Sequence, residues 1–336
     1  MTAEAKSTIL DPAGFFRRIP LAPHQMRERL TRTQDAIVLC HLGVPRIDRD
    51  EWSLTIDGLV ERACTLRYDD LMRYPRTDLT SFHQCAGSPL APFEPTRRVC
   101  NIIWSGARLA DVLADCRPRP AAEYIWSYGA DFGAFSGVAV DAYCKDLPIA
   151  RVAADVLIAY AMNGVELPAE HGFPARLLVP GFYGTNSVKW LTRISATNRR
   201  APGPFTTLWY NDPVLDAAGN ATGETTPVWS IAPESVIVSP ASHETIEVGV
   251  EREIWGWAWA DGGVQGVDIR ADGEMAWCAA EVERPRGREW QRFSMRWSPQ
   301  RRGTVVLTCR AMTGAGLRQP ETGRRNAIQA VPVNVV

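Results

Sequence analysis

The sequence predicts two consecutive domains, an α+β domain followed by an all-β sandwich of the immunoglobulin type. The chain has 336 residues, which is enough for two sizeable cores. Strand-like and helix-like periodicities mix in the first part of the chain, whereas only strand-like alternation follows later. Between the two parts lies a stretch rich in Gly, Ala, Thr and Asn, a composition typical of loops. We therefore expect an N-terminal extension at 1–35, the α+β domain at 36–215, a linker at 216–231 and the β domain at 232–336.

The α+β assignment depends on short segments with clear periodicity. WSLTIDGL and DLTSFHQ alternate as strands do, and the second of them ends at Cys85. RYDDLMRYP predicts a short acid-capped helix that Pro75 ends, and GARLADVLADC carries apolar residues at helical spacing. Two apolar runs on either side of Asn163-Gly164 predict a hairpin. PARLLVPG and SVKWLTRIS predict two further strands with a glycine-rich loop between them.

The β-sandwich assignment depends on alternation over about a hundred residues, a rhythm typical of immunoglobulin-like domains. Trp255, Trp257 and Trp259 alternate, and turns recur at Asp261-Gly-Gly and Asp272-Gly. Five tryptophans fall between residues 255 and 290, more than one small core needs. We take this aromatic surplus to predict an interface between two copies of the chain, hence a homodimer.

Composition excludes several classes of partner. Hydrophobic residues make up 46% and charged residues 22% of the chain, as in an ordinary soluble protein. The net charge of -1 offers no basic surface, so we expect neither nucleic acid nor an anionic membrane as partner. No apolar run is long enough to span a bilayer. The first twenty residues lack an export signal, and Ile-Pro rather than an apolar core follows Arg17-Arg18, so we expect a cytoplasmic protein.

The eight cysteines show no CxxC or CxxCH pattern. Zinc ribbons, thioredoxin-like motifs and covalent c-type haem are therefore excluded. In a reducing compartment most of these thiols should be free and buried. The motifs GxSxG, HExxH, GxGxxG and GxxxxGK[ST] are absent as well, which excludes further enzyme classes.

Three segments nevertheless hold residues suited to chemistry. Cys85 stands at a strand end before Ala86-Gly87, whose small size lets a bulky group approach the backbone, although a buried cysteine beside a tight turn is the commoner explanation. A zinc site made of Cys40, His41, His83 and Cys85 has suitable ligands but no familiar spacing. His41 itself, within the apolar run AIVLCHLGVPRID, is on pattern alone more typical of a core histidine.

The third segment is HGFPARLLVPGFYGTNSVKW, residues 171–190. His171, Arg176 and Lys189 flank two glycine turns, and Ser187 lies between them. Backbone amides with flanking cations form a plausible phosphate cradle. Exposed strand charges and a turn histidine explain the same pattern, and that simpler explanation is favoured when the segment is taken alone.

Longer stretches of the sequence carry a resemblance. They are QCAG at 84–87, WSGARLADVL at 104–113 and AYAMNGVELPAEHGFPARLLVPGFYGTNSVKWLTRI at 159–194, with GWAWADGG and CRAMTGAGLRQPE further on. In this order they resemble the sulfite oxidase family of molybdopterin-dependent oxidoreductases, over roughly residues 36–336. The resemblance implies an α+β molybdopterin-binding domain that holds one molybdenum-molybdopterin per chain, followed by a dimerisation domain.

The resemblance also implies residue roles. Cys85 matches the cysteine whose thiolate binds molybdenum, and a soft sulfur ligand suits that centre. Tyr210 matches a tyrosine on the substrate side of the metal. The residues that match the rest of the cofactor pocket are His41, Asp131, His171, Arg176, Ser187, Val188 and Lys189.

The substrate side departs from the family pattern. Leu39 and Leu90 stand where sulfite-oxidising members have arginines, and the family's Trp-Asn near the chain end is missing. Each lost charge-assisted contact to a dianion is worth about 1.5–3 kcal/mol. We therefore expect a neutral or singly charged substrate. The alternative is that other arginines rebuild the anion site, the candidates being Arg97, Arg98, Arg324 and Arg325.

The function predicted on this basis is two-electron oxo transfer to or from a small sulfur or nitrogen compound. The chain has no cytochrome b5-like domain and no haem motif, so electrons should pass to an external acceptor, either a cytochrome, another carrier or dioxygen. A true sulfite oxidase or dehydrogenase is the alternative within the family. A non-catalytic molybdopterin-binding or scaffold protein is the alternative from another class, and Cys85 argues against it, since a carrier has no use for a metal-binding thiol.

Overall fold

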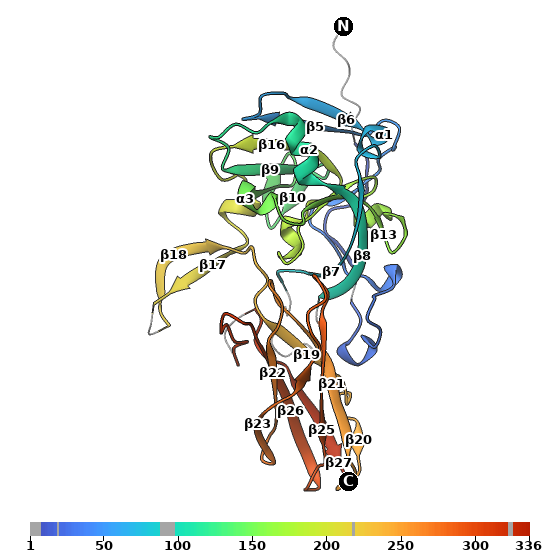
Figure 1. Cartoon of the computed structure of the whole chain (residues 1–336), viewed down its shortest axis with the longest axis vertical. Coiled ribbons are helices and arrows are strands. Elements are labelled where there is room, and N and C mark those ends of the chain that lie inside the picture. The colour runs from blue at the N-terminus through green and yellow to red at the C-terminus, as the bar shows by residue number, and fades with distance from the viewer. Residues whose placement is uncertain (1–7, 19, 88–97, 217–218, 322–324) are drawn as a thin grey trace.

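The computed structural model describes residues 8–18, 20–87, 98–216, 219–321 and 325–336. Figure 1 shows an upper part made of the first two thirds of the chain and a lower part made of the C-terminal strands. An α+β domain followed by an all-β sandwich is confirmed. Among the described residues, no helix has the length and apolar character needed to cross a bilayer.

Two five-stranded sheets build the upper part. The first has the order β12 (Cys144–Pro148), β9 (Tyr124–Gly129), β16 (Leu191–Thr197), β5 (Ser53–Gly58) and β6 (Cys64–Arg67). The second has the order β14 (Val165–Glu166), β13 (Leu157–Met162), β8 (Val99–Arg108) and β7 (Arg76–Gln84), with β15 (Arg176–Leu178) also paired to β13. All pairs are antiparallel except β16 with β5. Side chains from both sheets meet in one large core that includes Ile56, Ile158 and Ile194.

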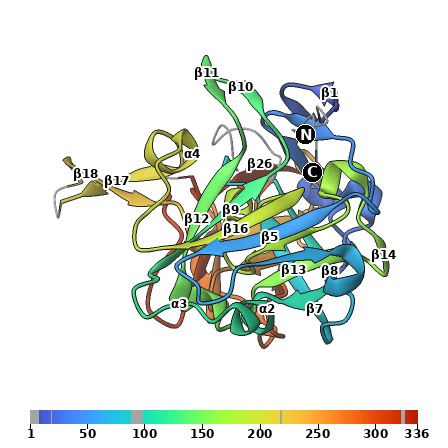
Figure 2. The ribbon, with the colours of Figure 1, turned by 90° about the horizontal axis from the view of Figure 1, so that it is seen from above.

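Short elements surround these sheets. The two-stranded sheets pair β1 (Leu10–Ala13) with β4 (Gly43–Pro45), β2 (Phe16–Arg18) with β3 (Val38–Cys40), β10 (Gly133–Phe135) with β11 (Val138–Val140), and β17 (Asn211–Leu215) with β18 (Ala221–Pro227). The helices are α1 (Tyr68–Leu71), α2 (Leu109–Cys116), α3 (Ile149–Val152), α4 (Pro204–Thr207) and the 3-10 turns η1 (Pro23–Gln25), η2 (Thr33–Asp35), η3 (Ala169–His171) and η4 (Gly184–Asn186). Hairpins β17–β18 and β10–β11 both project from the body (Figure 2).

The lower part consists of two packed sheets. One has the order β19 (Glu234–Ser239), β21 (Arg252–Trp259), β25 (Gln291–Trp297) and β24 (Glu281–Val282). The other has the order β20 (Thr245–Ile246), β27 (Ala330–Val335), β26 (Gly303–Met312), β22 (Gly266–Ala271) and β23 (Met275–Ala279). Inward-facing residues of both sheets, such as Ile254, Leu307 and Val333, form the core between them.

Local sequence explains the elements that position the pocket. The hairpin at Asn163-Gly164 forms as expected, and both residues have positive φ, 49° and 82°, as a two-residue turn between strands requires. The helix expected over 106–116 begins only at Leu109, because residues up to Arg108 continue β8. The strand expected over SVKWLTRIS begins only at Leu191, because the preceding Trp190 has φ 49°. Part of the expected linker is strand β18.

The two parts share a core at their junction. Trp257, Trp259 and Trp290 are at most 3% exposed and pack there against Phe82 and Tyr183. The indole of Trp259 donates to the Gln84 side chain at 2.8 Å, next to Cys85. The dimer prediction rested on the surplus of tryptophans between residues 255 and 290 of the β domain. Most of them are instead buried at the junction within one chain, so the tryptophan content was wrong as an argument for a subunit interface.

An ion-pair bridge also joins the two parts. The guanidinium of Arg288 contacts Asp155 of the upper part and Asp261 of the lower part, each at 2.5 Å. The carbonyl of Arg288 accepts the amide of Phe82 at 2.9 Å. The lower part therefore holds in place the end of β7, the strand that leads to Cys85.

Candidate active site

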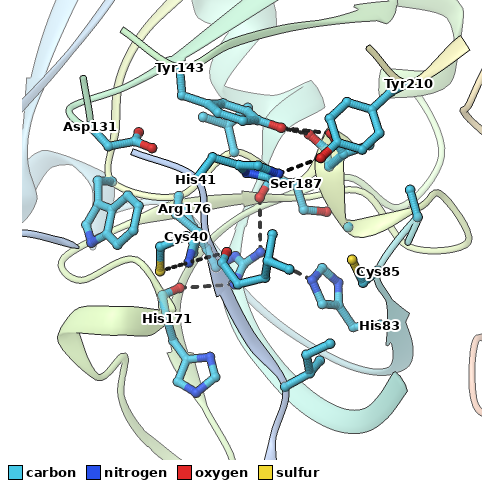
Figure 3. A pocket seen from close by; sticks show the side chains of 18 residues that line it. Cys40, His41, His83, Cys85, Asp131, Tyr143, His171, Arg176, Ser187 and Tyr210 are labelled. Carbon is cyan, nitrogen blue, oxygen red and sulfur yellow. Dashed lines mark hydrogen bonds between the residues drawn. The ribbon is translucent and has the colours of Figure 1, made fainter. Parts of the chain in front are cut away.

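A pocket opens in the upper part beside the junction. Nine residues predicted to form the site line it, as Figure 3 shows for most of them: His41, Cys85, Asp131, His171, Arg176, Ser187, Val188, Lys189 and Tyr210. They come from the end of β3, the end of β7, the loop after β9, the segment from η3 to β16, and the turn after α4. The fold therefore brings together residues that lie far apart in the sequence.

Cys85 directly follows β7 and presents a half-buried thiol to this pocket. Its amide donates to the carbonyl of Arg98 at 2.9 Å, which holds the strand end against the start of β8. The amide of Gly87 points at the sulfur, 3.4 Å away. A thiol that faces a cavity and receives an N–H is suited to bind a metal as thiolate.

Two buried cations, Arg176 and Lys189, lie in the same pocket and contact only neutral groups. Arg176 donates to the carbonyls of His171 and Ser187, both at 3.0 Å. Lys189 donates to the carbonyls of Leu39 and Glu170 at 3.1 and 2.9 Å, and to the sulfur of Cys40 at 2.9 Å. In the described parts of the chain, no carboxylate is within ion-pair distance of either cation. Burial lowers the pKa of Arg176 to about 10 and also lowers the pKa of Lys189, so both charges lack the anion that would stabilise them.

Three histidines of the pocket stay neutral. Burial, helped by the charge of Lys189, lowers the pKa values of His41 and His171 to about 3. Burial and then Arg176 lower the pKa of His83 well below its usual value. The Nε2 atom of His171 is buried and has no hydrogen-bond partner among the described residues. A buried nitrogen without a hydrogen-bond partner favours a polar ligand in the pocket.

Two glycines let these side chains converge. Gly172 has φ 108°, and a Cβ there would lie 3.0 Å from the Cβ of Lys189 and 3.1 Å from that of Arg176. A Cβ at Gly184 would lie 2.9 Å from the ring of His83. Close packing thus requires glycine at both positions, against the cations at Gly172 and against the His83 ring at Gly184.

Aromatic groups line the side of the pocket next to Cys85. Tyr210 has φ 58°, and its hydroxyl lies 2.5 Å from Nε2 of His41. Burial and the nearby Cys85 raise the pKa of Tyr210, so the phenol keeps its proton. The hydroxyl of Tyr143 contacts Thr185 at its carbonyl, 2.7 Å away, and at its hydroxyl, 2.8 Å away. Burial raises the pKa of Asp131 to about 7.

The residues expected on the substrate side are only partly brought together. Leu39 lines the pocket, whereas Arg98 is buried and lies outside its lining. Arg325 donates twice to the carboxylate of Asp212 and once to the carbonyl of Ala86, 2.5 Å away, so its charge is already paired. Leu90, Arg97 and Arg324 lie outside the described residues.

Several lining residues were not predicted as part of a cofactor pocket. Thr185 and Gly184 fall inside the long family-like run, so extending the assignment along that run finds them. His83 was considered only as a zinc ligand, and the described residues hold no cluster of three potential metal ligands. Tyr143 stands in no motif. The pairing of Cys144 with Tyr128 and its own backbone hydrogen bonds to Gly129 and Asp131 place it at the pocket.

The buried histidines predict acid sensitivity of the ligand-free protein. Between pH 6.5 and about 3 the unfolded chain protonates these side chains and the folded chain does not, so stability falls as the pH falls. Asp131, with its raised pKa, acts in the opposite direction between pH 7 and 3.8. From pH 7 to pH 5 the unfolding free energy of His171→Gln should fall by about 2 kcal/mol less than that of the wild type. Urea titrations at both pH values measure this, with His24→Gln, a change at an exposed histidine, as control.

Comparison with known proteins agrees with this geometry. Residues 41–205 match the oxidoreductase molybdopterin binding domain, and residues 225–333 match the Mo-co oxidoreductase dimerisation domain. The chain is 32% identical over 308 residues to mitochondrial sulfite oxidase of Homo sapiens, covering 84% of this chain and 56% of that protein. It is 30% identical over 277 residues to sulfite oxidase of Arabidopsis thaliana, covering 74% and 69%.

A solved structure agrees as well. The sulfane dehydrogenase SoxCD from Paracoccus pantotrophus superposes with a TM-score of 0.80 at 25% identity, over 99% of this chain and 92% of that one. The chain spans little more than half the length of the mammalian relatives. On the two matching domains and these relatives, the chain belongs to the sulfite oxidase family of molybdopterin-dependent oxidoreductases.

Proposed function

We propose that the protein is a molybdenum-dependent oxidoreductase that performs two-electron oxo transfer to or from a small sulfur or nitrogen compound. The observation that carries this proposal is one pocket that combines the half-buried Cys85 thiol with the desolvated cations Arg176 and Lys189. A thiolate suits the metal, and the cations suit the phosphate of a pterin.

The residues present fit a molybdenum-pterin group. Cys85 would bind the metal, while Arg176, Lys189 and Ser187 would hold the phosphate end. The unpaired Nε2 of His171 is available to a polar atom of the pterin. When bound, the group supplies the oxo-transfer and two-electron chemistry, and the protein supplies orientation and electrostatics.

Tyr210 and His41 are placed to hold a hydrogen-bond donor near Cys85. Their contact is 2.5 Å, and His41 is neutral because of its burial. When His41 carries its proton on Nε2, it donates to the Tyr210 oxygen and leaves the phenol hydrogen free for an oxygen of the substrate. The phenol keeps that hydrogen at neutral pH, since burial raises its pKa. Tyr210 therefore acts as a hydrogen-bond donor and orienting group in this proposal.

For the substrate we propose a neutral or singly charged compound. Leu39 faces the pocket, and Asp212 pairs the charge of Arg325, so neither residue offers a free cation to a dianion. The similarity to a sulfane dehydrogenase makes reduced sulfur compounds the first candidates. The alternative, a sulfite oxidase, needs another arginine to rebuild the anion site. Arg97 and Arg324 lie outside the described residues, and the guanidinium of Arg98 is close enough to influence Tyr210.

Steady-state assays distinguish a neutral or singly charged substrate from sulfite. We expect sulfoxides, N-oxides or reduced sulfur compounds to turn over better than sulfite. Leu39→Arg should tighten sulfite binding by about 10- to 100-fold, the value of one charge-assisted contact, and Leu39→Met is the control for shape. The double variant Leu39→Arg with Leu90→Arg should bind sulfite more tightly still. A micromolar KM for sulfite in the wild type would establish the sulfite oxidase alternative.

The proposed partners are an external electron acceptor and a second copy of the chain. Assays under anaerobic conditions with a cytochrome or an artificial carrier, and then with dioxygen, identify the acceptor. The dimerisation-domain match over residues 225–333 supports a homodimer through the β domain. Sedimentation at micromolar concentration should show a dimer, and a monomer there contradicts this proposal.

We also propose a cytoplasmic location. Its support is that the eight cysteines form no disulfide, which is the usual state of thiols in a reducing compartment. Cell fractionation tests it. The competing proposal, a molybdopterin carrier or scaffold without turnover, is disfavoured because Cys85 faces the pocket, and the assays above decide it.

A further inference from the structure

Two cysteines far from the pocket lie in direct contact. The sulfur atoms of Cys64, in β6, and Cys116, the last residue of α2, are 3.0 Å apart. Neither residue belongs to the molybdenum site proposed above, so their chemistry is independent of it.

Backbone hydrogen bonds hold the two segments that carry these thiols next to each other. The amide of Arg62 donates to the carbonyl of Cys116 at 3.1 Å, and the amide of Glu61 donates to the carbonyl of Arg117 at 2.9 Å. Val60 forms a bridge with Pro118 just beyond. A disulfide has an S–S bond of about 2.05 Å, so the sulfurs need to approach by only about 1 Å.

The two thiols differ in access. Cys64 is half-buried in β6, the edge strand of its sheet, whereas Cys116 is 1% exposed. Burial and the neighbouring Cys64 raise the pKa of Cys116 to about 12, so this thiol stays protonated. An oxidant from solvent therefore meets Cys64 first, and Cys116 is placed to react with the product.

We propose that Cys64 and Cys116 form an oxidisable dithiol that hydroperoxides convert into an intramolecular disulfide. The Cys64 sulfur attacks one peroxide oxygen, the O–O bond breaks, and hydrogen peroxide yields a sulfenic acid on Cys64 and one water. The Cys116 sulfur then attacks the Cys64 sulfur, and the displaced hydroxide leaves with the Cys116 proton as a second water. Two thiols lose two electrons and two protons, and one peroxide is reduced.

The disulfide stabilises the upper domain by constraining the unfolded chain. It ties β6 to the end of α2, whose Val112 and Leu113 lie in the main core. The bond closes a long loop in the sequence, and long loops gain most from such a constraint. We expect the Tm of the oxidised full-length protein to exceed that of the reduced protein by about 5–15 °C.

The experiment uses full-length Cys278→Ser as background, because the exposed Cys278 would otherwise join two molecules. The protein is treated with hydrogen peroxide, alkylated, digested and analysed by mass spectrometry, and its Tm is measured with and without dithiothreitol. We expect a peptide that links Cys64 to Cys116, reversed by dithiothreitol together with the rise in Tm. Protein that is already linked when purified supports the same pairing.

Matched variants distinguish this pair from general oxidation. Cys64→Ser and Cys116→Ser should each lose the linked peptide and the rise in Tm, whereas Cys144→Ser, at another half-buried thiol, should keep both. The proposal is overturned if Cys64 proceeds to a sulfinic acid, or stays alkylatable, while Cys116 remains a free thiol. An unchanged Tm despite a mapped disulfide overturns the stabilising role.

Discussion

Cys85→Ser is expected to abolish turnover while the protein stays folded and still retains pterin. A hydroxyl is a poor replacement for thiolate on molybdenum, whereas the change in volume is small. Mutation of a residue that only orients a metal ligand lowers metal affinity or activity by about 10–100-fold. Loss of the ligand itself should therefore lower kcat by more than about 100-fold. Steady-state kinetics, together with pterin fluorescence after denaturation, measures both quantities.

Cys100→Ser is the matched control. This thiol lies on β8 opposite His83, is buried, and points at the His83 carbonyl 3.7 Å away, where a hydroxyl also finds an acceptor. It does not line the pocket, so turnover should be close to that of the wild type. Activity of Cys85→Ser within a few-fold of the wild type would refute the role of Cys85 as metal ligand.

Arg176→Met is expected to weaken cofactor binding without unfolding the protein. At neutral pH the lowered pKa of Arg176 corresponds to a cost on the order of 3 kcal/mol for burying its charge. Loss of its bonds to the carbonyls of His171 and Ser187 offsets the relief of that cost, so the Tm of the ligand-free variant should change little. Affinity for the cofactor should fall by about 10- to 100-fold, the value of one charge-assisted contact to phosphate.

Pterin retained after gel filtration and the Tm of the ligand-free protein are measured together. Lys189→Met should behave in the same way. Arg193→Met is the control, since this exposed arginine pairs with Asp57 on the surface. A purely structural Arg176 gives the reverse pattern, with full pterin content in the folded fraction and a markedly lower Tm.

The fold was predictable where local pattern and burial agree. Alternation in β5 matches its alternating burial. The residues of α2 at helical spacing are the ones it buries, namely Leu109, Val112, Leu113 and Cys116. Prediction failed where tertiary contacts override the pattern. Trp190 takes a positive φ and donates from its indole to the carbonyl of Ala169, which delays the start of β16. The sequence around Trp190 shows no sign of that long-range bond.

The tryptophans show a second limit. Their number indicated that they bury a large apolar surface, but it could not show against what. Trp257 and Trp259 pack at the junction of the two parts, and their indoles reach Met26 and Gln84. An internal junction and a subunit interface both require large apolar side chains, so composition does not distinguish them and the structure does.

The pocket was predictable only through the family resemblance. Considered alone, His41 resembled a core histidine and Arg176 an exposed strand charge, yet both are buried and line one cavity. Their convergence depends on contacts between distant segments, such as Lys189 with Leu39. Tyr143 was missed because no motif contains it, although its ring lies 5.8 Å from that of His41.

Elemental analysis of protein purified from molybdate-replete cells tests the central claim most directly. Inductively coupled plasma mass spectrometry on the wild type and on Cys278→Ser, whose thiol lies outside the pocket, should give about one molybdenum per chain. Pterin should be present in the same ratio. Wild-type protein that is folded and free of molybdenum under these conditions would contradict the account.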